Sequence, residues 1–540
     1  MKRFVWDRSS IYRASIFFYP FFCVLILGFF LIPFTLEYLK ETIAFGCLTL
    51  LFYSLFLLFP KPIKNAAYIL FLMVLSLLTF FKLAFYFLYN VKPSISALFV
   101  VFETNFNETK EYLNQYLSFP VISLGIFIFL PLLFTIAFFI RKPNAAFFSH
   151  FNKTGLLKKL IFAFLVVGCG YIIHWKFSQE NLFLKGYYSF KEYREFKELI
   201  KSTISKPTSN YFQAVSKEDS TAETLVVVIG ESTTKWHMQL YGYERETNPK
   251  LNEIANELLV FEDVISPHVH TILSLEKTLT FATFEDPNPV PNASIIQMAN
   301  EAGFETYWIS NQQPIGVYES LSTMIANAAR HKYFMATEGY KYTIQDEALL
   351  PVLEDVLEES PKKKVVFVHL IGTHVAYRKR YPKEYGVFYK TSRPSLSAEA
   401  NEYINNYDNA VRYNDYIVRE IIEMIRPLKG QSAMVYFSDH GDDVYDVGDK
   451  LGHNEYNATP PMYEVPFILW ASKNHPLQEE LFIRKDTVLK RPYHLENFPY
   501  SFANLGGISF QKNDSSKSIF SKEYRYHKRI IKDTLDYDEN

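Results

Sequence analysis

Acidic residues and histidines directly follow three short apolar runs of this sequence. Glu231 follows the first run, His374 comes shortly after the second, and Asp439 and His440 follow the third. Carboxylates and imidazoles, with no cysteine among them, are the oxygen and nitrogen ligands that suit Zn²⁺ or Mn²⁺. If the three runs lie side by side in the fold, these residue types predict a metal site.

Each cluster also has an ordinary structural interpretation. Glu231 is compatible with the start of a helix, where an acidic side chain faces the positive end of the dipole. Asp439–Gly441 is compatible with a turn, because Asp and Gly favour turns. A single histidine such as His374 or His453 usually binds no metal. The repetition of such residues after successive strands favours the metal site.

The elements that position these residues are short apolar runs that alternate with helical patterns. Strands are expected at 225–229, 305–309, 365–370, 433–437 and 466–470, and helices at 293–302, 346–358 and 398–425. This alternation predicts an α/β domain with a largely parallel sheet covered on both faces. Ligand sites of such sheets lie beyond the carboxyl ends of the strands, which is where the three clusters fall.

The first third of the chain reads as a membrane region. Five apolar stretches have spanning length, approximately Ser15–Phe34, Ile43–Phe59, Ala66–Tyr89, Pro120–Ile140 and Leu160–Phe177. The third stretch contains Lys82, for which two explanations stay open: the side chain snorkels to the interface, or it lines a polar path.

The distribution of lysine and arginine orients this region. The N-terminus and the second and fourth loops are basic, so they are expected in the cytoplasm, and an odd number of spans puts the rest of the chain outside. We therefore divide the chain into a five-span domain (1–178) with an outer loop at 90–119, an interfacial helix and linker (179–222), and an exported catalytic domain (223–540). The helix is expected near Tyr188–Ile204, either in the headgroup region or packed on the soluble domain.

Composition narrows the function further. The formal net charge of -1 gives no sign of a nucleic-acid partner. The three cysteines, Cys23, Cys47 and Cys169, all lie in expected spans. The exported domain therefore has neither a disulfide nor a cysteine zinc site.

Several motifs together resemble the phosphoethanolamine transferases of Gram-negative envelopes, within the alkaline phosphatase and sulfatase superfamily. The segments Gly230–Ser232, Tyr241–Tyr243 and Arg245–Pro249 resemble the first motif of that family, and Asp439–Gly441 its last metal motif. Ser266–Leu275 resembles the stretch that carries its threonine nucleophile. The five-span anchor extends the likeness over nearly the whole chain.

The resemblance implies roles that the residues alone leave open, since Thr271, Ser274, Thr278 and Thr280 are all nearby hydroxyls. It implies Glu231, Asp439 and His440 as ligands of a catalytic Zn²⁺, with Mn²⁺ as a possible replacement, and Thr271 as fourth ligand and nucleophile. Metal coordination lowers the pKa of such a hydroxyl. Further substrate contacts implied by the family motifs are His374, His453, Asn311, Asn105, Glu108 and Thr109.

The expected reaction moves phosphoethanolamine from phosphatidylethanolamine to Thr271 and then to a lipopolysaccharide acceptor at the outer face of the bacterial inner membrane. The lipid A enzymes carry disulfides in the exported domain, and this chain carries none there. This favours core heptose or another glycan over lipid A as acceptor. The alternatives are a phosphoglycerol transferase for glucan or teichoic-acid-type acceptors and, from a different class, a non-enzymatic envelope sensor.

Overall fold

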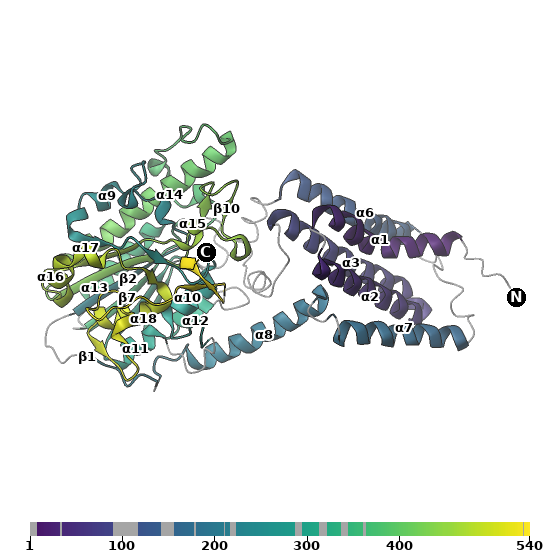
Figure 1. Ribbon diagram of the computed structural model, residues 1–540, viewed down its shortest axis with the longest axis horizontal. Helices are drawn as coiled ribbons and strands as arrows, with labels where there is room; N and C mark the ends of the chain where they lie inside the picture. Colours follow the sequence, from purple (N-terminus) through teal and green to yellow (C-terminus); the bar gives the residue numbers. More distant parts are fainter. Residues whose placement is uncertain are drawn as a thin grey trace. The chain divides into compact units, whose positions relative to one another are not determined.

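The computed structural model describes residues 8–32, 35–89, 117–141, 156–175, 177, 180–209, 211–216, 223–286, 294–312, 321–335, 344–359, 363–532 and 534–539. The chain divides into two compact units, residues 1–194 and 195–540, which are described separately below (Figure 1).

The first unit is helical. Four of its described helices are long and apolar enough to cross a membrane: α1 (Arg8–Leu31), α2 (Leu36–Leu58), α3 (Lys61–Tyr89) and α6 (Phe119–Arg141). A fifth, α7 (Leu156–Trp175), has a shorter apolar segment, Leu160–Trp175. The predicted helical membrane region is confirmed, as four long apolar helices and a shorter one.

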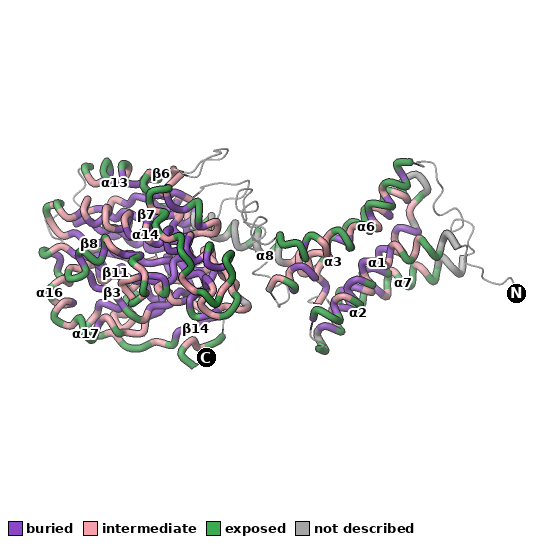
Figure 2. Tube along the Cα trace, turned by 90° about the horizontal axis from the view of Figure 1, so that it is seen from above, coloured by how far each residue is buried: buried purple, intermediate pink, exposed green. Residues whose placement is uncertain are grey.

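Aromatic side chains hold the helices of this unit together. The ring of Phe17 in α1 lies 5.2 Å, centroid to centroid, from both Phe56 of α2 and Tyr68 of α3, and all three are buried. Other large apolar side chains, among them Phe30 and Phe134, are exposed on the outside, as the green segments along the helices in Figure 2 illustrate. An apolar surface of this kind suits contact with lipid.

Helix α8 (Leu182–Thr203) follows and covers the helix expected near Tyr188–Ile204. Phe183, Tyr187 and Phe190 are exposed along it. Its place on the membrane surface stays a prediction.

The second unit is built on a seven-stranded sheet with the order β3-β11-β8-β2-β7-β5-β6. The strands are β2 (Glu223–Gly230), β3 (Leu258–Val260), β5 (Glu305–Ser310), β6 (His331–Phe334), β7 (Lys363–His369), β8 (Gln431–Ser438) and β11 (Phe467–Ala471). The five strands β8, β2, β7, β5 and β6 are parallel, and β11 is antiparallel to both its neighbours. The predicted α/β domain with a largely parallel sheet is confirmed.

Both faces of the sheet are covered because the strands are apolar on both sides. Along β2, Leu225, Val227 and Ile229 point into one core, whereas Val226 and Val228 point into the other. The first core includes α10 (Thr271–Leu279), α11 (Ile295–Glu301), α12 (Leu321–Ala326) and α18 (Phe498–Leu505). The second includes α13 (Leu349–Glu358) and α14 (Ala398–Ile425). Figure 2 shows the strands of the sheet as the buried centre of this unit.

Smaller elements complete the unit. They are the helices α9 (Pro249–Asn252), α15 (Pro460–Tyr463), α16 (Pro476–Ile483) and α17 (Lys485–Val488), and the short paired strands β1 (Val215–Ser216) with β13 (Ile508–Ser509), β4 (Val264–Ile265) with β12 (Tyr493–His494), β9 (Asp443–Val444) with β10 (Leu451–Gly452), and β14 (Ile530–Ile531) with β15 (Leu535–Asp536).

Candidate active site

The first and third clusters meet at the carboxyl edge of the sheet. Strands β2 and β8 are parallel neighbours in a register that pairs Gly230 with Ser438, so Glu231 and Asp439 leave the sheet side by side. The ligand atoms of Glu231, Asp439 and His440 all lie within 4.8 Å of one another. His440 Nε2 is 3.3 Å from Glu231 Oε1 and 3.6 Å from Asp439 Oδ2, and the three side chains are at most 1% exposed.

Backbone groups fix the two carboxylates in this position. Asp439 Oδ1 accepts the N–H groups of Ser232 (3.1 Å) and His440 (2.7 Å). Ser232 itself has the left-handed φ of 58°, which turns the chain sharply after the strand and lets its hydroxyl donate to Glu231 Oε1 at 3.0 Å. Asp439 Oδ2 is buried and has no hydrogen-bond partner among the described residues.

The end of β7 supports Glu231 from the other side. Gly372 has a φ of +52°, and a Cβ there would lie 2.8 Å from the backbone N and O of Glu231. Thr373 donates both its N–H (2.9 Å) and its hydroxyl (3.0 Å) to the Glu231 carbonyl. A side chain at position 372 would displace the backbone of Glu231, so this position requires glycine.

The structure separates the four hydroxyls that the sequence left open. Thr271 begins α10, and its Oγ1 donates to Glu231 Oε1 at 3.0 Å and Oε2 at 3.2 Å and lies 3.4 Å from His440 Nε2. Ser274 instead donates to the Asp439 carbonyl and Thr280 to the Glu276 carbonyl. Among the four, Thr271 is the one whose hydroxyl contacts the side chains of the cluster.

The two carboxylates of the cluster favour binding of a cation. Burial alone lowers the pKa of His440, but the carboxylates of Asp439 and Glu231 outweigh it and raise that pKa to about 10. Burial and the nearby Glu231 carboxylate raise the pKa of Asp439 well above its usual range. Two buried carboxylates beside one imidazole thus bind positive charge strongly, either as protons or as a metal ion.

The donor atoms fit a zinc ion. His440 Nδ1 lies 3.0 Å from the Gly441 carbonyl and donates to it, so Nε2, on the side of the two carboxylates, is the nitrogen that would bind a metal ion in place of a proton. The buried Asp439 Oδ2 without a partner is a further donor, and Glu231 and the Thr271 hydroxyl complete a set of oxygen and nitrogen ligands.

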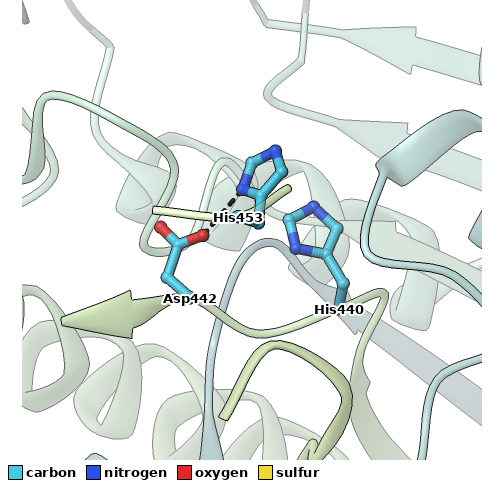
Figure 3. A group of neighbouring side chains, drawn as sticks. All are labelled: His440, Asp442 and His453. Carbon is cyan, nitrogen blue, oxygen red and sulfur yellow. Dashed lines mark hydrogen bonds and ion pairs between the residues drawn. The ribbon is translucent and has the colours of Figure 1, made fainter. Parts of the chain in front are cut away.

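His453 belongs to a second group that shares His440. Its Nδ1 is 2.7 Å from Asp442 Oδ1, and its ring centroid is 4.2 Å from that of His440 (Figure 3). Asp442 is buried and also accepts the hydroxyl of Tyr377 at 2.7 Å. The carboxylate therefore orients the imidazole, and Nε2 is the nitrogen of His453 left to act on a substrate.

The remaining predicted contacts lie in different surroundings. His374 is half-buried in the loop after Thr373. Asn311 is buried, and its Nδ2 donates to Ile344 O and Asp346 Oδ1, both at 2.9 Å. Asn105, Glu108 and Thr109 lie outside the described residues.

Two residues near the cluster were not predicted from the sequence. Gln312 Nε2 donates to Glu231 Oε2 and to the Leu370 carbonyl, both at 3.1 Å. Asp442 orients His453 as described above. Gln312 gave no signal beyond its place after a strand, and Asp442 stands in the sequence beside an equally acidic Asp443.

Comparison with known proteins agrees with this geometry. Residues 223–508 match the sulfatase family. Phosphoethanolamine transferase EptC of Escherichia coli O18:K1:H7 is 33% identical over 518 residues, which cover 89% of this chain and 88% of that protein. The chain belongs to the phosphoethanolamine transferase family.

Solved structures of the family agree in fold. The zinc complex of the C-terminal periplasmic domain of EptC from Escherichia coli has 32% identity and a TM-score of 0.56, covering 61% of this chain and 97% of that domain. The integral membrane protein EptA from Neisseria meningitidis has 19% identity and a TM-score of 0.63 over 96% of this chain and 97% of its own, which shows a shared fold.

These findings confirm the predicted resemblance. This phosphoethanolamine transferase family member is a multi-span membrane protein with a C-terminal periplasmic catalytic domain. The family assignment favours phosphoethanolamine transfer over the phosphoglycerol transferase and the envelope sensor that the sequence also allowed.

Proposed function

We propose that this enzyme takes phosphoethanolamine from phosphatidylethanolamine onto Thr271 and passes it to a lipopolysaccharide acceptor, core heptose or lipid A. The observation that carries the proposal is the hydroxyl of Thr271, at 3.0 Å from Glu231 and 3.4 Å from His440 at the start of α10. A threonine so placed is a nucleophile in contact with a metal-type cluster.

Glu231, Asp439 and His440 would hold one zinc ion, with Thr271 as the fourth ligand. When bound, the ion lowers the pKa of the threonine hydroxyl and offsets negative charge on the phosphoryl oxygens. The zinc complex of the related EptC domain supports this choice of metal. The buried Asp439 Oδ2, without a partner in the described part of the chain, supports it independently.

The chain's own residues would carry the transfer in two steps. Thr271 Oγ1, which has already lost its proton in the metal-loaded enzyme, bonds to phosphorus while the bond to the diacylglycerol oxygen breaks, and that oxygen takes a proton from His453. In the second step His453 removes a proton from the acceptor hydroxyl, whose oxygen bonds to phosphorus as the bond to Thr271 Oγ1 breaks, and Thr271 leaves in its deprotonated form. The hydrogen bond between His453 Nδ1 and Asp442 supports this role, because it fixes the orientation of the ring and leaves Nε2 to transfer the proton.

The N-terminus of α10 would hold the phosphate. Thr271 is the first residue of this helix, whose free N–H groups and dipole favour a negative charge at that end. His374 and Asn311 are proposed to contact the donor as well. The same proposal covers Asn105, Glu108 and Thr109 in the outer loop, for the ammonium and phosphate of the headgroup.

Intact-mass measurement of the detergent-purified protein after incubation with phosphatidylethanolamine tests the proposal. We expect a phosphoethanolamine adduct on the wild type and none on Thr271→Ala. Thr278→Ala is the matched control, because Thr278 is a buried threonine of the same helix with no hydrogen-bond partner among the described residues. An adduct on Thr271→Ala would exclude this nucleophile, and an adduct formed from phosphatidylglycerol alone would exclude the donor.

A further inference from the structure

An ion pair lies inside the helical unit, which does not contain the catalytic cluster. Lys82 Nζ of α3 is 2.6 Å from Glu41 Oε2 of α2, and the two side chains are only 8% and 15% exposed. Lys82 Nζ also lies 5.8 Å from the centroid of the Tyr38 ring. The lysine therefore turns into the unit instead of extending along its outer surface.

The pair lies near the level of lipid headgroups. Helix α3 has 29 residues, about 43 Å at 1.5 Å per residue, and so extends past a hydrocarbon core of about 30 Å at both ends. Lys82 is about 10 Å before the end of α3, and Glu41 about 7 Å after the start of α2. With the catalytic domain in the periplasm, both ends face the periplasm, so the pair lies roughly 5 Å below the outer edge of the hydrocarbon.

Packing fixes the pair at this level. The hydroxyl of Tyr38 donates to the Val24 carbonyl of α1 at 2.8 Å. Its ring fits against Gly28, where a Cβ would lie 2.5 Å from the Tyr38 oxygen. The side chain of Glu41 is itself 15% exposed, so the carboxylate lies just below the surface of the helical unit, against a wall formed by α1 and α2.

A buried ion pair in the membrane region is costly, so it usually serves a function. At this depth the aliphatic stem of a lysine is long enough for its ammonium group to reach the water interface. Solvation of the Lys82 charge alone would therefore not require Glu41. Thr79 and Ser76, three and six residues before Lys82 on α3, are also buried, and the Ser76 hydroxyl has no hydrogen-bond partner among the described residues. Polar groups thus continue inward from the pair.

We propose that Lys82 and Glu41 bind the zwitterionic headgroup of phosphatidylethanolamine in the outer leaflet and hold the donor lipid for the enzyme. The phosphodiester would contact Lys82 and the ammonium Glu41. A headgroup without net charge leaves the pair neutral, whereas anionic phosphatidylglycerol would leave one buried charge uncompensated. This inference rests on the proposed function, because it names where the donor of that reaction binds in the membrane.

Native mass spectrometry of lipid retained by the full-length protein tests the site. Using the Thr271→Ala background prevents consumption of the donor. We expect retention of phosphatidylethanolamine over phosphatidylglycerol, and about a tenfold loss of that retention in Lys82→Met. Lys64→Met is the matched control, since Lys64 is a buried lysine of the same helix near its other end.

Two further variants separate binding from folding. Glu41→Gln with Lys82→Met removes both charges together, and we expect a folded protein that no longer prefers phosphatidylethanolamine. Glu41→Lys with Lys82→Glu keeps an ion pair but reverses its direction relative to the headgroup, and we expect it to bind poorly. Wild-type retention by either double variant, or equal losses in Lys82→Met and Lys64→Met, would overturn the headgroup site.

The two proposals fail in different ways. If the wild type retains phosphatidylethanolamine but never forms an adduct on Thr271, the proposed reaction is wrong and the lipid site stands. If Lys82→Met with Thr271 intact forms the adduct at the wild-type rate at low mole fractions of phosphatidylethanolamine, the lipid site is wrong and the reaction stands.

Discussion

Two buried groups of histidine and carboxylate lie in the catalytic unit, and they differ in how completely they are paired. One is the catalytic cluster of Glu231, Asp439 and His440. The other, here called the His237 cluster, consists of His237, Asp408, Asp446, Arg245 and Arg393. The histidines and carboxylates of both clusters are buried, whereas the side chains of Arg245 and Arg393 are 13% and 29% exposed.

In the His237 cluster both carboxylates and both nitrogens of the imidazole have partners. His237 Nδ1 is 2.5 Å from Asp408 and Nε2 is 3.1 Å from Asp446. Arg245 and Arg393 add a second cation to each aspartate, at 2.6 Å. Both ring nitrogens have partners, which is what a purely structural network requires.

The catalytic cluster, in contrast, is not fully paired. It sets two carboxylates against one imidazole and leaves Asp439 Oδ2 without a hydrogen-bond partner in the described part of the chain. Burial and the presence of histidine and aspartate are the same in both groups. Within the catalytic unit, the difference teaches that the unsatisfied carboxylate oxygen and the excess negative charge, and not burial, mark the cluster that binds a metal ion.

The largest expected effect is on zinc binding. Asp439→Asn keeps the volume but removes the charged oxygen that has no partner. We expect zinc affinity to fall by at least about 100-fold, the upper end of what loss of a supporting residue costs, and the Thr271 adduct to disappear. Metal analysis after dialysis against a chelator measures this. Asp446→Asn in the His237 cluster is the control, and equal zinc loss in both variants would contradict the comparison.

The reverse pattern is expected for the His237 cluster. His237→Gln should lower the free energy of unfolding by about 3 kcal/mol, because it breaks a buried pair, and should leave zinc affinity unchanged. Chemical denaturation followed by tryptophan fluorescence measures the loss. Lys250→Gln, which removes an exposed pair with Glu253, should cost less than about 0.5 kcal/mol.

The His237 cluster also predicts a dependence of stability on pH. Burial lowers the pKa of His237, but the carboxylates of Asp408 and Asp446 raise it by more, to about 9. The unfolded chain has a histidine pKa of about 6.5. The stabilisation is therefore complete below that pH and is lost as the pH rises through about 9, and His237→Gln should flatten this part of the curve. If His237→Gln and the wild type show the same dependence of stability on pH, His237 is not protonated to the imidazolium form in the folded protein.

A smaller effect on the rate is expected at Asp442. Asp442→Asn should slow adduct formation about tenfold, because Asp442 orients His453. Asp442 is not one of the predicted zinc ligands. Zinc content should stay at the wild-type level. Asp443→Asn is the matched control, because Asp443 accepts the hydroxyl of Thr459 and stabilises a turn. Loss of zinc in Asp442→Asn would place Asp442 among the ligands instead.

The smallest effect is expected at Gln312. Gln312→Leu removes one hydrogen bond to Glu231 Oε2 and should weaken zinc binding about threefold, in line with the net value of a single hydrogen bond. Competitive titration with a zinc chelator resolves a change of this size. A loss as large as that of Asp439→Asn would mean that Gln312, and not only the carboxylates, determines the geometry of the site.

Much of the architecture could be predicted from the sequence, because the signals are local. The apolar runs that became β2, β7 and β8 alternate with helical patterns, and helix 398–425 was predicted to the residue. The lengths of the apolar stretches predicted the membrane helices, because a bilayer demands about 20 apolar residues in a row. Glu231, Asp439 and His440 could be proposed because parallel strands bring their ends to one edge.

Only the tertiary structure decided between residues of the same type. Asp442 and Asp443 are adjacent, yet the first orients His453 and the second caps a turn. From the sequence alone, the Lys82 side chain could extend to the interface or turn into the helical unit. Its partner Glu41 lies 41 residues away on another helix, so only the structure shows the pair. The sequence by itself determined the elements and the edge at which the chemistry lies. The hydrogen-bond partner of each polar side chain depends on segments of the chain that meet only after folding, so only the structure could assign these partners.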